Sequence, residues 1–177
     1  MANNKYEIKT KSIQKKIFQF IDESPGIRYR ELLRITGLTN GVLSYHLNLL
    51  HNSAKVRINR VNDRVTRYFS HDVPIEEFNL IGLFRQPTTR KIIMYILESG
   101  NCGFNDIVMH TKKVPSTISW HLSKLSDANI IRVRKQNEFK YYEIGINKSK
   151  LQDLLSKYTS SSTEKTVDDY IDMMNEF

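Results

Sequence analysis

The sequence predicts a mainly α protein with small β-hairpins, an α+β fold that contains one structural unit twice. The first observation is a repeat: residues 39–50, TNGVLSYHLNLL, return seventy-five positions later as residues 114–125, VPSTISWHLSKL. The second is that each copy has apolar residues at i, i+4 and i+7, the spacing of one face of an amphipathic helix. The third is that the period changes from 3.6 to 2 after the first copy, where apolar and polar residues alternate, and a similar segment follows the second copy; this predicts a hairpin after each.

The first copy of the unit predicts a helix-turn-helix. Periodic apolar residues indicate helices near 11–23 and 28–36, and the polar residues 1–10 are expected to be loose. Gly37 ends the second helix, because glycine accepts the left-handed conformation that a tight turn needs. Thr39 is a suitable N-cap for the helix that follows. Two helices joined by a short glycine-containing turn are a helix-turn-helix.

A hairpin follows each helix-turn-helix and predicts a wing. In the first copy its strands are Val56–Val61 and Val65–Phe69, and in the second Ile130–Lys135 and Phe139–Ile144. The helices of the second copy are expected near 88–99, 104–111 and 115–127. The return strand matches at an offset of 73 residues, Arg67 against Lys140, so the second wing is predicted to be two residues shorter.

These patterns divide the chain into four parts. They are a first winged helix-turn-helix domain (1–73), a connector (74–87), a second winged helix-turn-helix domain (88–146) and a C-terminal helical tail (147–177). The connector is rich in apolar residues and is expected to be packed, with a short helix that begins at Pro74 and is closed by Pro87.

Charge and cysteine content limit the class of protein. The formal net charge is +8, and residues 1–70 alone hold 13 Lys and Arg against 5 Asp and Glu, whereas the tail is acidic. An anionic partner is therefore expected. A single cysteine, Cys102, excludes an internal disulfide and a cysteine-only zinc site, and is expected in a loop or half-buried. The longest apolar run, Ile92–Leu97, is too short to cross a membrane. The expected location is the cytoplasm, with no cofactor, metal or membrane contact.

The face opposite each apolar stripe carries small and amide side chains instead of the usual Glu and Lys. Such side chains can approach base edges and hydrogen-bond them. The candidate DNA-binding residues of the first helix are Thr39, Asn40, Gly41, Ser44, Tyr45 and Asn48, and those of the second are Ser116, Thr117, Ser119, Trp120 and Lys124. Tyr45 and Trp120 either stack on a sugar or base, or pad the base of the wing.

Basic residues gather on the wings and beside the second candidate helix. The candidates for phosphate contact are Arg57, Arg60, Arg64 and Arg67 on the first wing, Arg132, Arg134, Lys135 and Lys140 on the second, and Lys112 and Lys113 before the second helix. Because this lysine pair replaces Gly37-Leu38, we expect Val114 to supply the buried contact of the turn and Pro115 to be the first helical residue.

The segments Ser44-Tyr45-His46-Leu47 and Ser119-Trp120-His121-Leu122, each followed by a basic hairpin, resemble the winged-helix transcription regulators of the ArsR-like group. The pair of units is similar to tandem regulators common in archaea, and the resemblance covers about residues 11–145. It implies a recognition helix in the major groove of double-stranded DNA and a wing along the backbone or minor groove. The cysteine pair of the metal-sensing members is absent, so metal sensing does not carry over. His46 and His121 are interpreted as structural residues packed under the wing.

The sequence thus favours a sequence-specific DNA-binding transcription regulator. No nucleotide loop or catalytic motif is present, so an enzyme is not expected. The alternatives are a winged-helix interaction scaffold in the transcription machinery and a non-specific chromatin-coating protein.

The last apolar stripe of the tail predicts a homodimer. Its members are Val167, Tyr170, Ile171, Met174 and Phe177. A lone helix of this length is marginal in water, so the stripe must be covered, either by a second chain or by the connector at 75–84.

Overall fold

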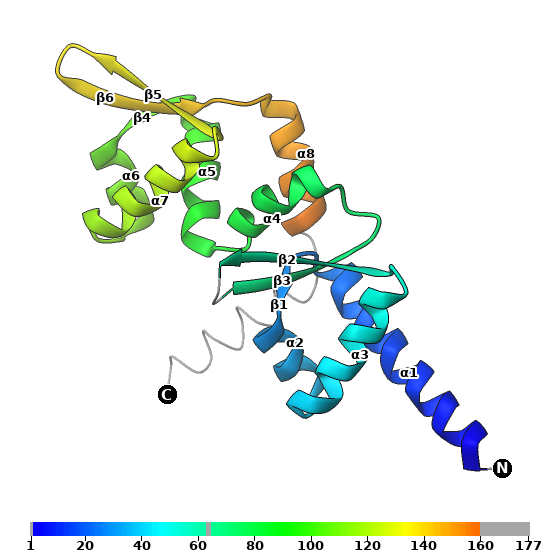
Figure 1. Ribbon diagram of the computed structural model, residues 1–177. Helices are drawn as coiled ribbons and strands as arrows, with labels where there is room; N and C mark the ends of the chain where they lie inside the picture. The colour runs from blue at the N-terminus through cyan, green and yellow to red at the C-terminus, as the bar shows by residue number, and fades with distance from the viewer. Residues whose placement is uncertain (1, 63–64, 160–177) are drawn as a thin grey trace. The chain divides into compact units, whose positions relative to one another are not determined.

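The computed structural model describes residues 2–62 and 65–159, and the side chains of residues 10–60 and 65–158. The chain divides into two compact units between Phe78 and Asn79 (Figure 1). This division falls inside the stretch 74–87, and the limits of the four parts drawn from the sequence stay a prediction.

The first unit is a winged helix-turn-helix, as predicted. Its elements are α1 (Ala2–Glu23), β1 (Ile27–Arg28), α2 (Tyr29–Thr36), α3 (Asn40–Asn52), β2 (Val56–Asn62) and β3 (Val65–Ser70). The strands form an antiparallel sheet in the order β1-β3-β2. One face of the sheet packs on the helices, and the buried core consists of Ile17, Ile21, Ile27, Leu32, Leu43, Leu47, Leu50, Val56 and Tyr68.

The first helix is longer than the sequence predicts. It begins at Ala2, whereas residues 1–10 were expected to be loose. These residues lack the apolar period that indicates a helix, but residues 2–10 also lack the glycine and proline that would stop one. Once Ile17 and Ile21 pack into the core, each further residue toward the N-terminus needs only propagation of an existing helix, which is far easier than nucleation.

Each sheet has a third strand that the sequence analysis missed. β1 pairs Ile27 with Tyr68, and its counterpart β4 (Asn101–Gly103) pairs Cys102 with Tyr142. Segments of two or three residues are too short to show an alternating pattern. Tertiary pairing alone makes them strands, and β3 and β6 (Phe139–Ile144) thereby become the central strands of their sheets.

The register of the second wing differs from the prediction. Val56 lies opposite Ser70, and Ile131 lies opposite Ile144, so the return strands correspond at an offset of 74 residues (70 to 144), not 73. The second hairpin is one residue shorter, because the first contains a bulge between Arg60 and Asn62. A bulge holds one unpaired residue, which matching by residue type does not detect. In the correct register Tyr68 corresponds to Tyr142.

The start of the connector, up to Phe78, packs on the outer face of the first sheet. After β3 the chain forms the 3-10 helix η1 (Ile75–Glu77) and then α4 (Phe78–Phe84). The Phe78 ring stacks on Phe69 with 3.8 Å between centroids, and Phe69 is fully buried. The predicted short helix is therefore present, but Pro87 does not close it, because Pro87 is the first residue of the next helix.

The second unit repeats the plan of the first. Its elements are α5 (Pro87–Ser99), β4, α6 (Phe104–Thr111), α7 (Pro115–Asp127), β5 (Ile131–Gln136) and β6 (Phe139–Ile144). Its fully buried isoleucines are Ile92, Ile93, Ile96, Ile107 and Ile118. The predicted first residue of α7, Pro115, is confirmed.

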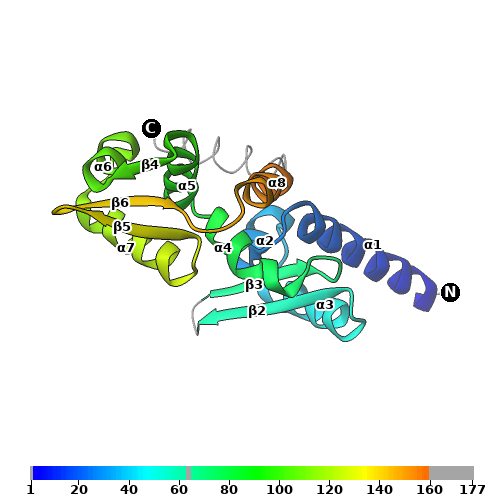
Figure 2. The same cartoon turned by 90° about the horizontal axis from the view of Figure 1, so that it is seen from above.

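The chain continues into α8 (Lys148–Thr159), which lies beside α4 in both views (Figures 1 and 2). Its apolar side, Leu151, Leu154, Leu155 and Tyr158, is buried. The second stripe of the tail, residues 167–177, lies outside the described residues.

Core burial of α3 yields a stability prediction. Leu43 is fully buried, whereas its neighbour Val42 is 39% exposed. Leu43→Ala should lower the free energy of unfolding by about 2–5 kcal/mol, because the side chain leaves a cavity. Val42→Ala, the matched control, should change it by less than about 1 kcal/mol. Urea denaturation measures both, and equal losses would contradict the orientation of α3.

Candidate nucleic-acid interface

The orientation of α3 is set by which of its faces is buried. Leu43, Leu47 and Leu50 lie in the core. The opposite face, formed by Asn40, Gly41, Ser44, Tyr45 and Asn48, is exposed. The helix therefore presents amide and hydroxyl groups outward on a support that cannot rotate without exposing its leucines.

The turn before α3 brings the helix into place. Gly37 has φ +64°, the left-handed conformation expected of it, and its N–H donates to the carbonyl of Leu33 at 3.1 Å. Thr39 is the N-cap, as predicted, but its hydroxyl makes no capping hydrogen bond. Both Thr39 and Asn40 are exposed at the start of the helix, where unpaired N–H groups attract anions.

Tyr29 is a site residue that sequence reasoning missed. It is the first residue of α2, and its hydroxyl donates to the carbonyl oxygen of Asn40 at 2.9 Å. The same hydroxyl lies 2.9 Å from the Ser44 Oγ. Tyr29 therefore ties α2 to the exposed face of α3. Comparison of the two repeats could have pointed to Tyr29. The equivalent residue seventy-five positions later is Phe104, so the two units differ here by a single hydroxyl group.

Arg67 does not serve as a phosphate contact, contrary to the prediction. It is only 3% exposed, and its guanidinium donates to the carbonyl oxygen of Gly26 at 2.7 Å. The reason is that β3 is a central strand. Successive side chains on such a strand point to opposite faces, and here both faces are covered: Tyr68 packs on the helices, and Phe69 packs on Phe78.

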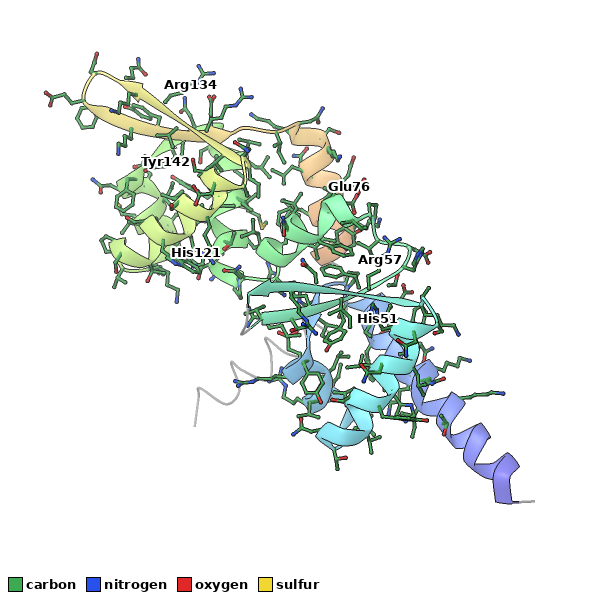
Figure 3. The ribbon with its side chains drawn as sticks, viewed as in Figure 1. His51, Arg57, Glu76, His121, Arg134 and Tyr142 are labelled. Carbon is green, nitrogen blue, oxygen red and sulfur yellow. The ribbon has the colours of Figure 1, made fainter. Side chains whose placement is uncertain are left out.

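The remaining arginines of the first wing differ in accessibility. Arg57 is half-buried at the base of the wing (Figure 3). It donates to the carbonyl oxygen of Val73 at 3.2 Å, and its Nη2 lies 3.0 Å from His71 Nε2. Arg60 is exposed, and strand alternation places it on the same face of the sheet as Ile58 and Tyr68, the helix side. Arg64 lies outside the described residues. Among the arginines of this wing whose side chains are described, Arg60 is thus the one that is exposed.

The outward face of α7 is also exposed. Ser116, Ser119, Trp120 and Lys124 are exposed, and Thr117 is half-buried. The Lys124 ammonium lies 3.8 Å from the centroid of the Trp120 ring, a cation–π contact that occupies one face of the indole. Trp120 is 51% exposed and Tyr45 is 58% exposed. Neither ring is buried as padding for a wing would be.

The turn before α7 uses a lysine where the first unit has glycine. Lys112 adopts the left-handed conformation, with φ +53°, which lysine rarely does. Lys112 and Lys113 are both exposed. Val114 is 62% exposed, so the expected buried contact from this residue is wrong. The turn is held by the Lys112 N–H, which donates to the carbonyl of Val108 at 3.0 Å.

The basic residues of the second wing all face solvent. They are Arg132, Arg134, Lys135 and Lys140. Arg134 donates to Glu143 at 2.7 Å, which neutralises part of its charge. Strand alternation places Lys135 and its partner Lys140 on the face that holds Tyr142, and Arg134 on the opposite face. Arg134 and Tyr142 are labelled on this wing in Figure 3. The wing therefore carries cations on both sides.

The two equivalent histidines are buried structural residues. His121 Nδ1 lies 2.8 Å from the hydroxyl of Thr89, on α5. Nδ1 of His46 is buried without a hydrogen-bond partner among the described residues. Desolvation lowers the pKa of both imidazoles, and the charge of Lys124 lowers that of His121 further. The predicted structural role is consistent with this burial, but His121 bonds to the first helix of its unit, not to the wing.

The described residues contain no group of three His, Cys, Asp or Glu side chains placed to hold a metal ion. Cys102 lies in β4 and is buried, neither in a loop nor half-buried, and burial raises the pKa of its thiol to about 11. Within the same part of the chain, every helix is too short or too polar to cross a bilayer.

Sequence comparisons relate the chain to transcription regulators. Residues 87–133, from α5 into β5, match the family described as "Bacterial regulatory protein, arsR family". Two HTH-type transcriptional regulators of Methanocaldococcus jannaschii, both described as uncharacterized, are similar. MJ1398 is 32% identical over 85 residues, which are 48% of this chain and 21% of the relative. MJ1325 is 34% identical over 61 residues, which are 34% of this chain and 68% of the relative.

Solved structures with similar regions include HlyU from Vibrio cholerae, with 16% identity, a TM-score of 0.43 and coverage of 48% of this chain and 94% of that one. A second is titled "Possible transcriptional regulator for arsenical resistance", with 26% identity, a TM-score of 0.37 and coverage of 49% and 91%. Because both TM-scores are below 0.5, neither structure bears on what this chain does.

The buried histidines predict that acid destabilises the protein. Because burial lowers both pKa values below 6.5, the unfolded chain binds more protons than the folded one as the pH falls past 6.5. The free energy of unfolding should therefore decrease from pH 7 to pH 5. In His121→Gln this decrease should be smaller, which thermal unfolding across the range measures. A wild-type stability that is flat or rises on acidification would contradict the assignment.

Proposed function

Because this chain belongs to the helix-turn-helix transcription regulators, with an ArsR-family domain in its second unit, we propose that it binds double-stranded DNA sequence-specifically, with α3 and α7 in the major groove and the wings on the backbone. Proteins of this family regulate transcription and are not enzymes. The observation that carries the proposal is the exposed amide and hydroxyl face of α3, whose opposite side is buried.

Different residues would supply affinity and base selectivity. Asn40 and Asn48 carry amides that can bond adenine in two places, and both are exposed on α3. Arg60 on the first wing, and Lys112, Lys113, Lys135 and Lys140 in the second unit, supply exposed positive charge for phosphates. Arg57 and Arg67 instead hold the first wing in shape through bonds within the unit. Arg64 remains a candidate.

A second candidate function, docking of another protein, is favoured by one feature of the second unit. Phe139 is 68% exposed at the wing and lines a groove together with Phe104, Asn105 and Ser119. Exposed aromatic rings beside polar groups are typical of protein contacts. DNA binding that tolerates loss of the whole α7 face would favour this function for the second unit.

We also propose that the protein is a homodimer, joined through the C-terminal tail. The apolar side of α8 is already buried within the single chain, so it is not available to a partner. The stripe Val167, Tyr170, Ile171, Met174 and Phe177 therefore carries the proposal. A two-fold dimer would present symmetric units to an inverted-repeat site.

The first test separates phosphate contact from base reading. A preferred duplex is selected from a random pool, and affinities for it and for an unrelated duplex are measured over a range of salt concentrations. Arg60→Ala should weaken binding to both duplexes and flatten the salt dependence by about one unit in slope. Asn40→Ala, the matched control, should cost about 1–3 kcal/mol on the preferred duplex and little on the other. Selection of no common sequence would point to non-specific coating, and no duplex binding would point to a scaffold.

The second test concerns the tail. A chain that ends at Thr159, the last residue of α8, should be a monomer by light scattering, whereas the full chain should be a dimer. A monomeric full chain, or a truncated chain that remains a dimer, would rule out the tail as the dimer contact.

A further inference from the structure

We propose that Ser44 reads DNA as a hydrogen-bond acceptor only, so that it selects a base with an exocyclic amino group, adenine or cytosine, because Tyr29 holds its hydroxyl proton. Ser119, the equivalent residue of the second unit, has no such restriction. The inference rests on the proposed function, since it requires α3 to lie in the major groove.

The direction of each hydrogen bond follows from counting protons. The carbonyl oxygen of Asn40 has no proton, so in its 2.9 Å contact with Tyr29 the tyrosine hydroxyl must be the donor. A tyrosine hydroxyl has one proton, and this bond uses it. In the second contact, 2.9 Å between Tyr29 Oη and Ser44 Oγ, the donor must therefore be Ser44. The serine proton points inward, toward α2, and only its lone pairs face solvent.

An oxygen that can only accept distinguishes bases in the major groove. Adenine presents the N6 amino group and cytosine the N4 amino group, and both are donors. At this edge guanine and thymine present only acceptors, as do phosphate oxygens. The exposed side of Ser44 can therefore pair with adenine or cytosine on the contacted strand, and it gains nothing from guanine, thymine or the backbone.

The second unit has the same local frame without the hydroxyl. Tyr29 and Phe104 are each the first residue of a helix that follows an extended N-cap. In both units the N-cap N–H donates to a carboxylate three residues on, Glu31 at 3.1 Å and Asp106 at 2.9 Å. Phe104 has no oxygen, and among the described residues Ser119 Oγ has no hydrogen bond and is exposed. Its proton is free to turn toward guanine, thymine or phosphate.

The size of the base preference follows from the hydrogen bond that Ser44 would lose if its hydroxyl turned from Tyr29 toward DNA. For Ser44 to donate to DNA, it must release Tyr29 and leave that acceptor unpaired. An intramolecular hydrogen bond contributes about 0.5–1.5 kcal/mol, which corresponds to about a two- to tenfold difference in affinity. We expect a preference of this size for adenine or cytosine over guanine or thymine at the base that Ser44 contacts.

The experiment uses the full-length protein and the duplex selected by the wild type, with each position replaced in turn by the other three base pairs. Comparison of Ser44→Ala with the wild type identifies the contacted position as the one where the variant loses base selectivity. Tyr29→Phe removes the hydroxyl that holds the serine proton. At the contacted position it should reduce the preference for adenine or cytosine about two- to tenfold, or invert it. Tyr29→Phe combined with Ser44→Ala should match Ser44→Ala alone in base preference, because Tyr29 acts through Ser44.

Phe104→Tyr supplies an independent arm in the second unit. It adds the missing hydroxyl beside Ser119 and should shift the base that Ser119 contacts toward adenine or cytosine, with Ser119→Ala as its control. Thermal unfolding of every variant checks folding. A merely structural role for Tyr29 would lower affinity for all duplexes alike without changing the preferred base.

The outcomes separate this inference from the proposed function. If the wild type shows no base selectivity at any position, both are wrong. If it is selective but Ser44→Ala changes no position, or Tyr29→Phe leaves the preference of the contacted position unchanged, the proposed function stands and the inference is overturned. The inference is supported if Tyr29→Phe moves the base preference away from adenine or cytosine and Phe104→Tyr moves it toward them.

Discussion

Burial of one side of α3 is the constraint on which the first unit depends. Leu43, Leu47 and Leu50 lie in a core built from α1, α2 and the inner face of the sheet. Rotation of the helix by a third of a turn would expose leucines that each contribute about 2–3 kcal/mol when buried. The polar residues between them therefore have one direction available, outward. The same constraint acts on α7 through Ile118, Leu122 and Leu125.

The central position of β3 sorts the charged residues of the first wing. When a strand is paired on both edges and packed on both faces, its side chains cannot reach solvent. Arg67 is buried for that reason and bonds to the backbone of Gly26. β2 is an edge strand, and its cations become more exposed toward the tip, from the half-buried Arg57 to the exposed Arg60. Identical side chains on adjacent strands thus have different roles, one structural and one available to a phosphate.

The two units share a backbone plan but differ in chemistry at equivalent positions. Tyr29 becomes Phe104, Gly37 becomes the left-handed Lys112, and the half-buried Leu38 becomes the exposed Lys113. Each change alters what the surface can donate or accept, and the last one also replaces a side chain that packs against the core of the first unit. Duplication of a unit followed by substitutions of this kind allows one chain to present two different surfaces.

The sequence by itself determined the tandem winged helix-turn-helix, because the helical and alternating periods are local properties that survive in any packing. It also located the outward faces of α3 and α7, since an apolar stripe implies its polar opposite. Tertiary structure alone decided the rest. The strands β1 and β4 exist only as partners of β3 and β6, and the bulge between Arg60 and Asn62 exists only in a pairing register. The burial of Arg67 depends on what covers β3, and the hydrogen bond between Ser44 and Tyr29 joins residues fifteen positions apart on different helices. Contacts of this kind depend on how elements meet in space, which no period along the chain records.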